Sequence, residues 1–239
     1  MRGRIVVKCG GAVASQAAAG VLTLLEAGHE VVVVHGAGPQ ISAELERHGL
    51  EVRFVGGRRV TSAAALEIVR ESFLAVNREL CAAIGPRAVG LAGDEIGLQA
   101  VPLPELGLVG EPLPSRPPAI EAALAEGLVP VVAPLAAGPL NVNADEAAAA
   151  LAIGLEAERI LFVTDVPGLL RGGAVVPEIE VDEADELLPS LEGGIVPKLK
   201  AAIVAARGGI QAEIGETVVA LEPGLPRDRG TDFSLSRTC

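Results

Sequence analysis

Short, continuous apolar runs alternate along the chain with amphipathic stretches of helical length. Strands are predicted at residues 4–7, 30–35, 52–55, 88–91, 128–133, 159–164, 210–214 and 217–221. Helices are predicted at residues 12–26, 38–48, 62–84, 120–126, 146–157, 184–188 and 193–207. Runs without polar interruption, such as residues 31–34, are typical of parallel strands covered on both faces. The alternation therefore predicts an α/β fold, a three-layer αβα sandwich around a mostly parallel central sheet.

Two glycine-containing loops follow neighbouring strands of this predicted sheet. The sequence KCGG at residues 8–11 follows the first strand, and GAGP at residues 36–39 follows the second. Glycine lets the backbone approach an anion closely, and ligands of open α/β sheets bind at the carboxyl ends of the strands. Neither loop fits the dinucleotide-binding or P-loop pattern, and each alone is equally compatible with a tight turn. Together, with Lys8 in front of the first loop, they favour a phosphate site.

The stretch NVNAD at residues 141–145 connects a predicted strand to a predicted helix. Asn143 is suited to cap the helix, and Asp145 falls in the first turn, where a carboxylate is favoured. Unpaired amides at a helix start also attract anions. Capping accounts for Asn143 and Asp145 but leaves Asn141, which we place on the loop before the cap, as a candidate ligand-binding residue.

Lysine is scarce in this chain, which has sixteen arginines but only Lys8, Lys198 and Lys200. A retained lysine suggests a need for a compact ammonium that a guanidinium does not replace. Lys198 follows Gly193 and Gly194 at a predicted helix start, where the helix dipole disfavours a cation unless an anion binds there. Lys200 is predicted to be an ordinary surface residue.

A second cationic candidate lies in the loop GGRRVT at residues 56–61. The planar guanidinium of Arg59 can bind a carboxylate through two parallel hydrogen bonds. The adjacent Arg58 does not easily point in the same direction and is predicted to be solvated. Arg59 is therefore a candidate for holding an acidic substrate.

Composition narrows the class of partner. The formal net charge is −12, which argues against nucleic acid and anionic membranes as partners. The chain has four Phe but no Tyr or Trp, so stacking of bases on aromatic rings is not expected. We expect small-molecule ligands instead.

Sequence features also bear on the compartment. The odd number of cysteines (Cys9, Cys81 and Cys239) and the lack of a CxxC pair indicate a reducing compartment without a zinc site. Arg2 and Arg4 lead directly into a strand-like run, so no signal peptide is expected. The longest uncharged stretch, residues 127–144, contains three Pro and two Asn and is a poor membrane span. A soluble, cytoplasmic protein is predicted.

These motifs together resemble the amino acid kinase family. The matching stretches are KCGG at 8–11, HGAGP at 35–39, GRRVT at 57–61, AVGLAGD at 88–94, GLVG at 107–110, NVNAD at 141–145, TDVPG at 164–168, GIVPK at 194–198 and GT at 230–231. They occur in family order over nearly the whole chain. The resemblance implies ATP-dependent phosphorylation of the side-chain carboxylate of N-acetyl-L-glutamate to an acyl phosphate, a step of arginine biosynthesis.

The resemblance also assigns roles to residues. It implies that Lys8 and Lys198 stabilise the transferring phosphoryl group and that Asp145 orients both ammonium groups. The acylated amino acid would be held by Gly36, Ala37, Gly38, Arg59 and Asn141. ATP would be bound by Gly10, Gly11, Thr164, Asp165, Gly168, Leu169 and Gly194, with Mg²⁺ bridging its phosphates and no metal-ligating residue assigned.

By the same resemblance, residues 1–239 form a single kinase domain. Residues 1–158 would form the N-terminal lobe that binds the amino acid, and residues 159–239 the C-terminal lobe that binds ATP. The chain lacks the N-terminal extension of arginine-inhibited, hexameric members, so a homodimer without arginine feedback is expected.

The chain departs from the family pattern in two places. Ala37 replaces the middle glycine of a triple-glycine loop, where a methyl group would crowd the site and disfavour positive φ. Arg58 stands where the family usually has Leu, which leaves open a kinase that acts on carrier-protein-linked aminoadipate or glutamate in lysine biosynthesis. A catalytically inactive sensor of amino acids or nucleotides is the alternative of another class.

Overall fold

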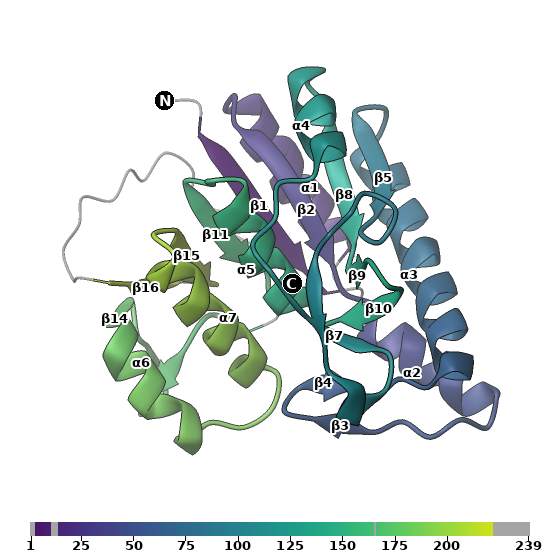
Figure 1. Cartoon of the computed structure of the whole chain (residues 1–239). Coiled ribbons are helices and arrows are strands. Elements are labelled where there is room, and N and C mark those ends of the chain that lie inside the picture. The colour runs from purple at the N-terminus through teal and green to yellow at the C-terminus, as the bar shows by residue number, and fades with distance from the viewer. Residues whose placement is uncertain (1–2, 11–13, 165, 222–239) are drawn as a thin grey trace.

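The computed structural model describes residues 3–10, 14–164 and 166–221 (Figure 1). Its centre is an eight-stranded sheet in the order β14-β16-β15-β11-β1-β2-β8-β5. These strands are β1 (Arg4–Cys9), β2 (Glu30–His35), β5 (Ala88–Ala92), β8 (Val129–Ala133), β11 (Arg159–Phe162), β14 (Glu178–Glu180), β15 (Gln211–Ile214) and β16 (Thr217–Ala220). Among the described strands of this sheet, all neighbours pair in parallel except β15 and β16, which confirms the predicted mostly parallel sheet.

Helices cover both faces of the sheet (Figure 1). They are α1 (Ala14–Glu26), α2 (Gly38–Arg47), α3 (Ala63–Ile84), α4 (Pro118–Ala125), α5 (Ala144–Gly154), α6 (Val181–Leu187) and α7 (Ile195–Arg207), with short 3₁₀ turns at Pro104–Leu106 and Leu188–Ser190. None of the helices in the described part of the chain combines the length and hydropathy needed to cross a membrane.

The central strands are apolar at successive positions because each face packs on a different helical layer. Side chains of a strand alternate between its faces. Val6 and Val32 belong to one buried cluster with residues of α4, α5 and α7. Ile5 and Val31 belong to another cluster with residues of α1 and α3. The three-layer αβα architecture predicted from the uninterrupted apolar runs is confirmed.

Short strands form three small sheets beside the main sheet. A four-stranded sheet has the order β6-β7-β10-β9, formed by β6 (Ala100–Pro102), β7 (Val109–Pro112), β9 (Leu135–Ala136) and β10 (Leu140–Val142). Two hairpins pair β3 (Phe54–Val55) with β4 (Arg58–Arg59) and β12 (Leu170–Arg171) with β13 (Ala174–Val175). Strand β3 falls within the strand predicted at residues 52–55, whereas β4, β9 and β10 were not predicted. Asn141 therefore lies in strand β10, and its predicted position on a loop was wrong.

The order of the strands places one end of β1 at the centre of the molecule. Strand β2 pairs with one edge of β1, and the chain later returns to place β11 along the other edge of β1. Such a reversal leaves a crevice at the carboxyl ends of the strands, where ligands of α/β sheets bind. Lys8 and the two predicted glycine loops lie at these carboxyl ends.

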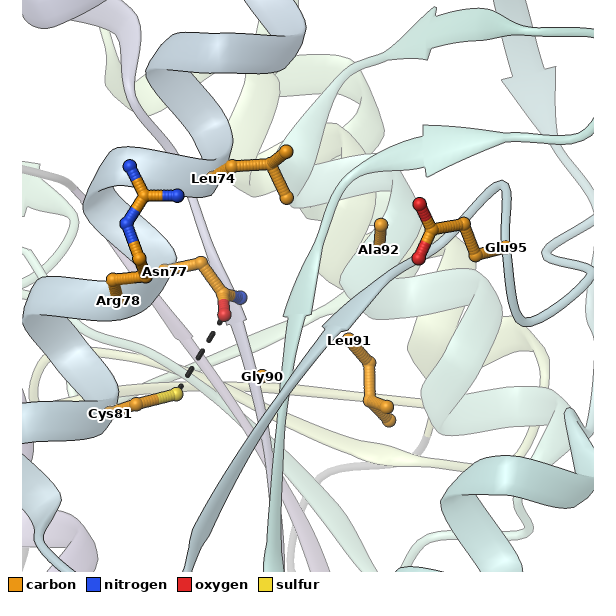
Figure 2. A pocket seen from close by; sticks show the side chains of 8 residues that line it. All are labelled: Leu74, Asn77, Arg78, Cys81, Gly90, Leu91, Ala92 and Glu95. Carbon is orange, nitrogen blue, oxygen red and sulfur yellow. Dashed lines mark hydrogen bonds between the residues drawn. The ribbon is translucent and has the colours of Figure 1, made fainter.

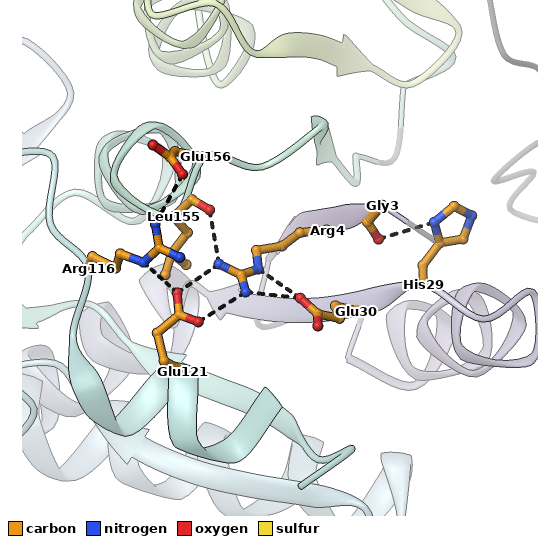
Figure 3. Close-up of polar contacts among 8 residues, drawn as sticks. All are labelled: Gly3, Arg4, His29, Glu30, Arg116, Glu121, Leu155 and Glu156. Atoms are coloured by element: carbon orange, nitrogen blue, oxygen red, sulfur yellow. Dashed lines mark hydrogen bonds and ion pairs between the residues drawn. The ribbon is translucent and has the colours of Figure 1, made fainter. Parts of the chain in front are cut away.

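At the opposite end of the sheet, Arg4 joins three elements (Figure 3). Its Nη1 and Nη2 atoms donate to the two carboxylate oxygens of Glu121 on α4, at 2.8 and 3.1 Å. Nη1 also donates to the carbonyl of Leu155, and Nε donates to Glu30 at 3.0 Å. The Arg4 guanidinium holds the pKa of Glu121 below its usual value. This cluster stabilises the fold far from the carboxyl ends of the strands.

Replacing Arg4 with alanine should lower the free energy of unfolding by about 1–3 kcal/mol, because charge-assisted hydrogen bonds of a half-buried side chain are lost. Arg116 contacts the same Glu121 carboxylate at 2.8 Å, but its side chain is 49% exposed, against 14% for Arg4. The matched variant Arg116→Ala should therefore cost less than about 1 kcal/mol. Urea unfolding of both variants measures the difference, and equal losses would contradict this account of the cluster.

Candidate active site

Three residues far apart in the sequence meet at the carboxyl end of β1. The Lys8 Nζ atom lies 2.8 Å from Asp145 Oδ1, and the Lys198 Nζ atom lies 3.6 Å from the same oxygen. All three side chains are largely removed from solvent, with exposed fractions of 6% for Lys8, 7% for Asp145 and 16% for Lys198. Lys200, by contrast, is exposed, as predicted. The structure thus brings two of the three lysines to one carboxylate.

Local structure fixes the carboxylate between the two ammonium groups. The Asn143 side chain caps α5 by accepting hydrogen bonds from the amides of Asp145 and Glu146, at 2.8 and 3.2 Å. This confirms the predicted cap and places Asp145 in the first turn, where the helix dipole favours a negative charge. Asn143 also donates to the carbonyl of Gly57 at 3.0 Å, which ties the β3–β4 hairpin to the start of α5.

The cluster carries more positive than negative charge. Two ammonium groups face one carboxylate, so these three side chains carry a net positive charge. That charge favours binding of a further anion. Burial lowers the pKa of Lys198, and the charge of Lys8 lowers it further, whereas Asp145 raises it. A bound phosphate would favour the charged form of Lys198. The arrangement is therefore suited to stabilise negative charge on a phosphoryl group.

The glycine loop after β2 begins helix α2 without backbone strain. Ala37 has φ −143° and ψ 28°, so the conformation does not require glycine at this position. The residue is 1% exposed and belongs to a buried cluster with Ile41 and Phe73. The expectation that the methyl crowds the site and opposes a positive φ was wrong. Gly38, where an added Cβ would meet nothing within 4 Å, leaves open space beside the loop.

The loop offers two amides rather than three. The amide of Gly36 donates to the carbonyl of Cys9 at 2.8 Å, so it is already engaged. The amide of Ala37 has no backbone acceptor among the described residues. Gly38 is the first residue of α2, where an amide has no partner within the helix. The amides of Ala37 and Gly38 are therefore the ones available to a ligand.

Arg59 is held next to this loop. Its Nη2 atom donates to the Gly38 carbonyl at 3.0 Å and to Ser42 Oγ at 2.9 Å, and its guanidinium carbon lies 4.5 Å from the centre of the Phe54 ring. The Nη1 atom is buried and has no hydrogen-bond partner within the described structure. An unpaired buried donor is costly unless a ligand satisfies it, so Arg59 is poised to bind an acceptor such as a carboxylate.

Asn141 lies close to Arg59 through a shared partner. Its side-chain amide donates to Thr61 Oγ1 at 3.0 Å, and the Thr61 hydroxyl donates to the Arg59 carbonyl at 2.8 Å. All three residues are buried. This chain of hydrogen bonds links the Asn141 side chain to the backbone of Arg59 and so fixes Asn141 relative to β4.

Arg58 is not the solvated residue that the sequence predicted. Its Nε atom donates to both carboxylate oxygens of Glu146 at 3.0 Å, and its Nη2 atom lies 3.3 Å from Glu111. The side chain is 21% exposed. Two carboxylates reach it because α5 and β7 come close to the hairpin, a contact that sequence proximity does not reveal. The charge of Arg58 is therefore compensated within the chain.

The residues predicted to bind ATP are less closely gathered. Gly10 directly follows β1, and Gly194 precedes α7 and is exposed. The Leu169 side chain is in the main core, and its amide donates to Thr217 Oγ1 at 2.8 Å. Gly168 has φ 152°, and an added Cβ would lie 2.6 Å from the same hydroxyl. Thr164 is buried just beyond β11. Gly11 and Asp165 lie outside the described residues.

Sequence reasoning missed a buried polar pair behind the glycine loop. His35, the last residue of β2, is 0% exposed, and its Nε2 atom lies 3.1 Å from the side-chain nitrogen of Asn77 on α3. Asn77 is one of the chain's three asparagines, and this scarcity was the available signal. Burial lowers the pKa of His35 from its ordinary 6.5 to about 4, and the charge of Lys8 lowers it as well.

The lowered pKa of His35 predicts a loss of stability in acid. Between pH 6.5 and about 4, the unfolded chain binds a proton at this imidazole and the folded chain does not. The free energy of unfolding therefore falls as the pH drops through this range, with about 3 kcal/mol from His35. Urea unfolding at pH 7 and pH 4.5 should show a smaller acid loss for His35→Asn than for the unmodified protein. Equal losses would contradict the assignment.

Comparison with known proteins gives a consistent picture. The family model described as "Amino acid kinase family" matches residues 3–216. The chain is 43% identical over 233 residues to the acetylglutamate kinase of Frankia casuarinae, covering 86% of this chain and 64% of that protein. It is 43% identical to the Salinispora tropica acetylglutamate kinase and 42% to that of Rubrobacter xylanophilus, covering 87% and 88% of this chain and 80% and 87% of theirs. The chain thus spans less than two thirds of the Frankia relative.

Solved structures agree with this fold. The crystal structure of smu.665 from Streptococcus mutans matches with a TM-score of 0.85 and 29% identity, covering 93% of this chain and all of the other. Carbamate kinase from Giardia lamblia, solved with AMP-PNP, matches with a TM-score of 0.70 at 16% identity, covering 92% of this chain and 99% of the other. The second likeness is one of fold alone.

Proposed function

This chain belongs to the amino acid kinase family, and we propose that it transfers the γ-phosphoryl group of ATP to the side-chain carboxylate of N-acetyl-L-glutamate. The product is an acyl phosphate, as required for arginine biosynthesis. The observation that carries the proposal is the meeting of Lys8 and Lys198 at Asp145. The relatives named acetylglutamate kinase support the choice of acceptor.

The chemistry needs positive charge and orientation more than it needs a base. A carboxylate is already a nucleophile, so one of its oxygens attacks the γ-phosphorus while the bond to the leaving ADP breaks, and no proton moves. Catalysis then depends on positioning the reactants and on fixed charge around the phosphoryl oxygens. In this proposal Lys8 and Lys198 supply that charge, and Asp145 holds both ammonium groups in place before the substrates arrive.

The acylated amino acid would bind on the β4 side of this cluster. The unpaired Nη1 atom of Arg59 supports a role in binding a carboxylate, which forms charge-assisted hydrogen bonds with guanidinium. Asn141, fixed through Thr61, would bind another polar group of the substrate. The amides of Ala37 and Gly38 would donate to the reacting carboxylate or to the phosphoryl group. This assigns the amino acid to the N-terminal lobe, residues 1–158.

The nucleotide would bind on the C-terminal lobe, residues 159–239. Gly194 and Lys198 lie at the start of α7, Thr164 and Gly168 follow β11, and Gly10 follows the neighbouring strand β1. Gly11, Asp165 and the backbone of Leu169 complete the proposed ATP site. No group of three or more metal-ligating side chains occurs in residues 3–10, 14–164 and 166–221. We propose that Mg²⁺ enters with ATP, as is usual for Mg²⁺ held mainly by substrate phosphates and water.

The described structure gives less support to the two alternatives, a kinase of carrier-linked substrates and an inactive sensor. A kinase acting on a carrier-linked substrate would need a basic face for its acidic carrier, but Arg58 is paired with Glu146 and Glu111. An inactive sensor would have no need for two buried ammonium groups around one carboxylate. Both observations favour the kinase that acts on free N-acetylglutamate.

Trapping the acyl phosphate with hydroxylamine tests the proposal. With ATP and Mg²⁺, the protein should form a hydroxamate from free N-acetylglutamate. A parallel reaction with carrier-linked aminoadipate should give none. Turnover with the carrier-linked substrate alone would replace the proposed acceptor, and the absence of turnover with both would favour the sensor.

We also propose that the protein is a homodimer. Strand β5 is an edge of the eight-stranded sheet, and within the described structure its outer side has no neighbouring strand. Such an edge offers unpaired backbone groups to another chain. Light scattering at several concentrations would give the mass, and a monomer at all of them would exclude the dimer.

A further inference from the structure

We propose that His35 and Asn77 form a buried positioning pair, which orients the Gly36–Ala37 peptide so that the Ala37 amide faces the substrate. This inference rests on the kinase function proposed above, because it assigns that amide to the reacting groups. Neither side chain touches the substrate in this proposal. Their effect passes through the backbone of the glycine loop.

The contacts of Asn77 fix the orientation of its side-chain amide. Its side-chain nitrogen lies 2.8 Å from the carbonyl of Val131 on β8. A backbone carbonyl only accepts hydrogen bonds, so the atom facing it is the NH₂ group, which fixes the otherwise ambiguous amide. The same nitrogen lies 3.1 Å from His35 Nε2 and donates its second hydrogen there. The Nε2 atom is therefore an acceptor.

The hydrogen bond from Asn77 determines the tautomer of His35. A neutral imidazole that accepts at Nε2 carries its hydrogen on Nδ1. The Nδ1 atom lies 3.4 Å from the Gly36 carbonyl, at the long end of the hydrogen-bond range. The ring also packs edge-on against Phe73, with 6.0 Å between ring centres. Burial keeps the pKa of His35 at about 4, so the neutral ring persists at neutral pH.

His35 holds the peptide between Gly36 and Ala37 through the Gly36 carbonyl. In a trans peptide the carbonyl and the next amide point in opposite directions. The Gly36 carbonyl turns inward to the buried imidazole, so the Ala37 amide turns away from it. The other side of Gly36 is fixed as well, because its own amide donates to the Cys9 carbonyl at 2.8 Å. The loop is thus held from within, while the Ala37 amide lacks a backbone acceptor in the described structure.

The space for the Asn77 side chain depends on a glycine in the neighbouring strand. Figure 2 shows Asn77 and Cys81 on α3 beside Gly90 of the edge strand β5. A Cβ atom added to Gly90 would lie 2.2 Å from Asn77 Oδ1, so the strand requires glycine there. The Cys81 thiol donates to the same oxygen at 3.7 Å. Cys81 therefore contacts Asn77 without contributing to the tautomer of His35, which makes it a matched control.

The test compares Asn77→Asp with Cys81→Ala in the full-length protein. Nitrogen NMR of ¹⁵N-histidine-labelled protein reports which ring nitrogen of His35 carries the hydrogen. Unmodified protein and Cys81→Ala should both carry it on Nδ1. Asn77→Asp offers an acceptor to Nε2, so its ring should carry hydrogen on Nε2. Hydrogen on Nε2 in the unmodified protein, or an unchanged tautomer in Asn77→Asp, would overturn the proposal.

Kinetics separate positioning from simple destabilisation. Asn77→Asp should lower kcat about 10–100-fold, by analogy with residues that orient a metal ligand from outside the metal site, with an unchanged KM for ATP. His35→Asn keeps a hydrogen-bond donor near the position of Nδ1, whereas His35→Leu does not. The kcat of His35→Asn should therefore be higher than that of His35→Leu. Both are measured at temperatures where circular dichroism shows that the two variants are folded. Equal kcat for these two variants would overturn the proposal. Because the tautomer is measured without turnover, an inactive unmodified protein would count against the kinase function alone.

Discussion

Replacing Lys8 with methionine should lower kcat about 10²–10³-fold, the usual cost of removing one fixed donor to a developing negative charge. The Lys8 ammonium is buried and lies 2.8 Å from Asp145, so water does not replace it readily. Lys8→Arg should also be strongly impaired, because a planar guanidinium does not fit the place of a compact ammonium. The same losses are expected for Lys198→Met and Lys198→Arg. Initial rates at saturating ATP and N-acetylglutamate measure the effect.

Lys200→Met is the matched control for these variants. Lys200 belongs to the same helix as Lys198, but its side chain is exposed. Its removal changes the net charge by the same amount without touching the cluster, so kcat should stay within about twofold, as is usual for surface substitutions. A comparable loss in Lys200→Met would show that general charge matters, and full activity of Lys8→Arg would remove Lys8 from the mechanism.

Replacing Asp145 with asparagine should lower kcat by about 10² and move the alkaline limb of the pH–rate profile to lower pH. Burial already lowers the pKa of Lys198, and Asp145 is the group that opposes this shift. Asparagine keeps the shape but removes the negative charge, so the pKa of Lys198 falls further. The active form is the charged ammonium, and activity is lost as pH rises above that pKa.

The measurement is kcat from about pH 6 to pH 10, the range below and around the ordinary lysine pKa, for the unmodified protein and for Asp145→Asn. The acid limb should move less, because Lys198 stays charged at low pH. Glu146→Gln is the control: Glu146 is the next residue on α5 and pairs with Arg58 rather than with the lysines. An unchanged alkaline limb in Asp145→Asn would show that Asp145 does not set the charge of Lys198.

The main architecture was predictable because its signals are local and long. The strand at Glu30–His35 and the helix at Ala63–Ile84 follow the predicted boundaries closely, since apolar runs and helical periodicity extend over enough residues to be recognised. Strand β3 lies within the strand predicted at residues 52–55, whereas β4, β9 and β10 have two or three residues each and carry no such signal. Pairing with distant segments determines them, and that is why Asn141 was misplaced.

The charged residues of the candidate site could be predicted from the sequence, but the residues packed around them could not. Lysine scarcity and family motifs identified Lys8 and Lys198, and the structure places both at Asp145. The conformation of Ala37 and the partners of Arg58 depend on packing between elements far apart in the sequence. His35 and Asn77 were missed for the same reason, since β2 and α3 supply them 42 residues apart.

A crystal structure with ADP, a planar metal fluoride that mimics the transferring phosphoryl group, and N-acetylglutamate would show whether both ammonium groups surround that group. We expect the Nζ atoms of Lys8 and Lys198 each to lie within about 3 Å of fluoride or oxygen atoms around it, as charged donors do. We also expect Asp145 still to contact both ammonium groups. Lysine nitrogens that face separate cavities, or solvent, in this complex would contradict the proposed mechanism.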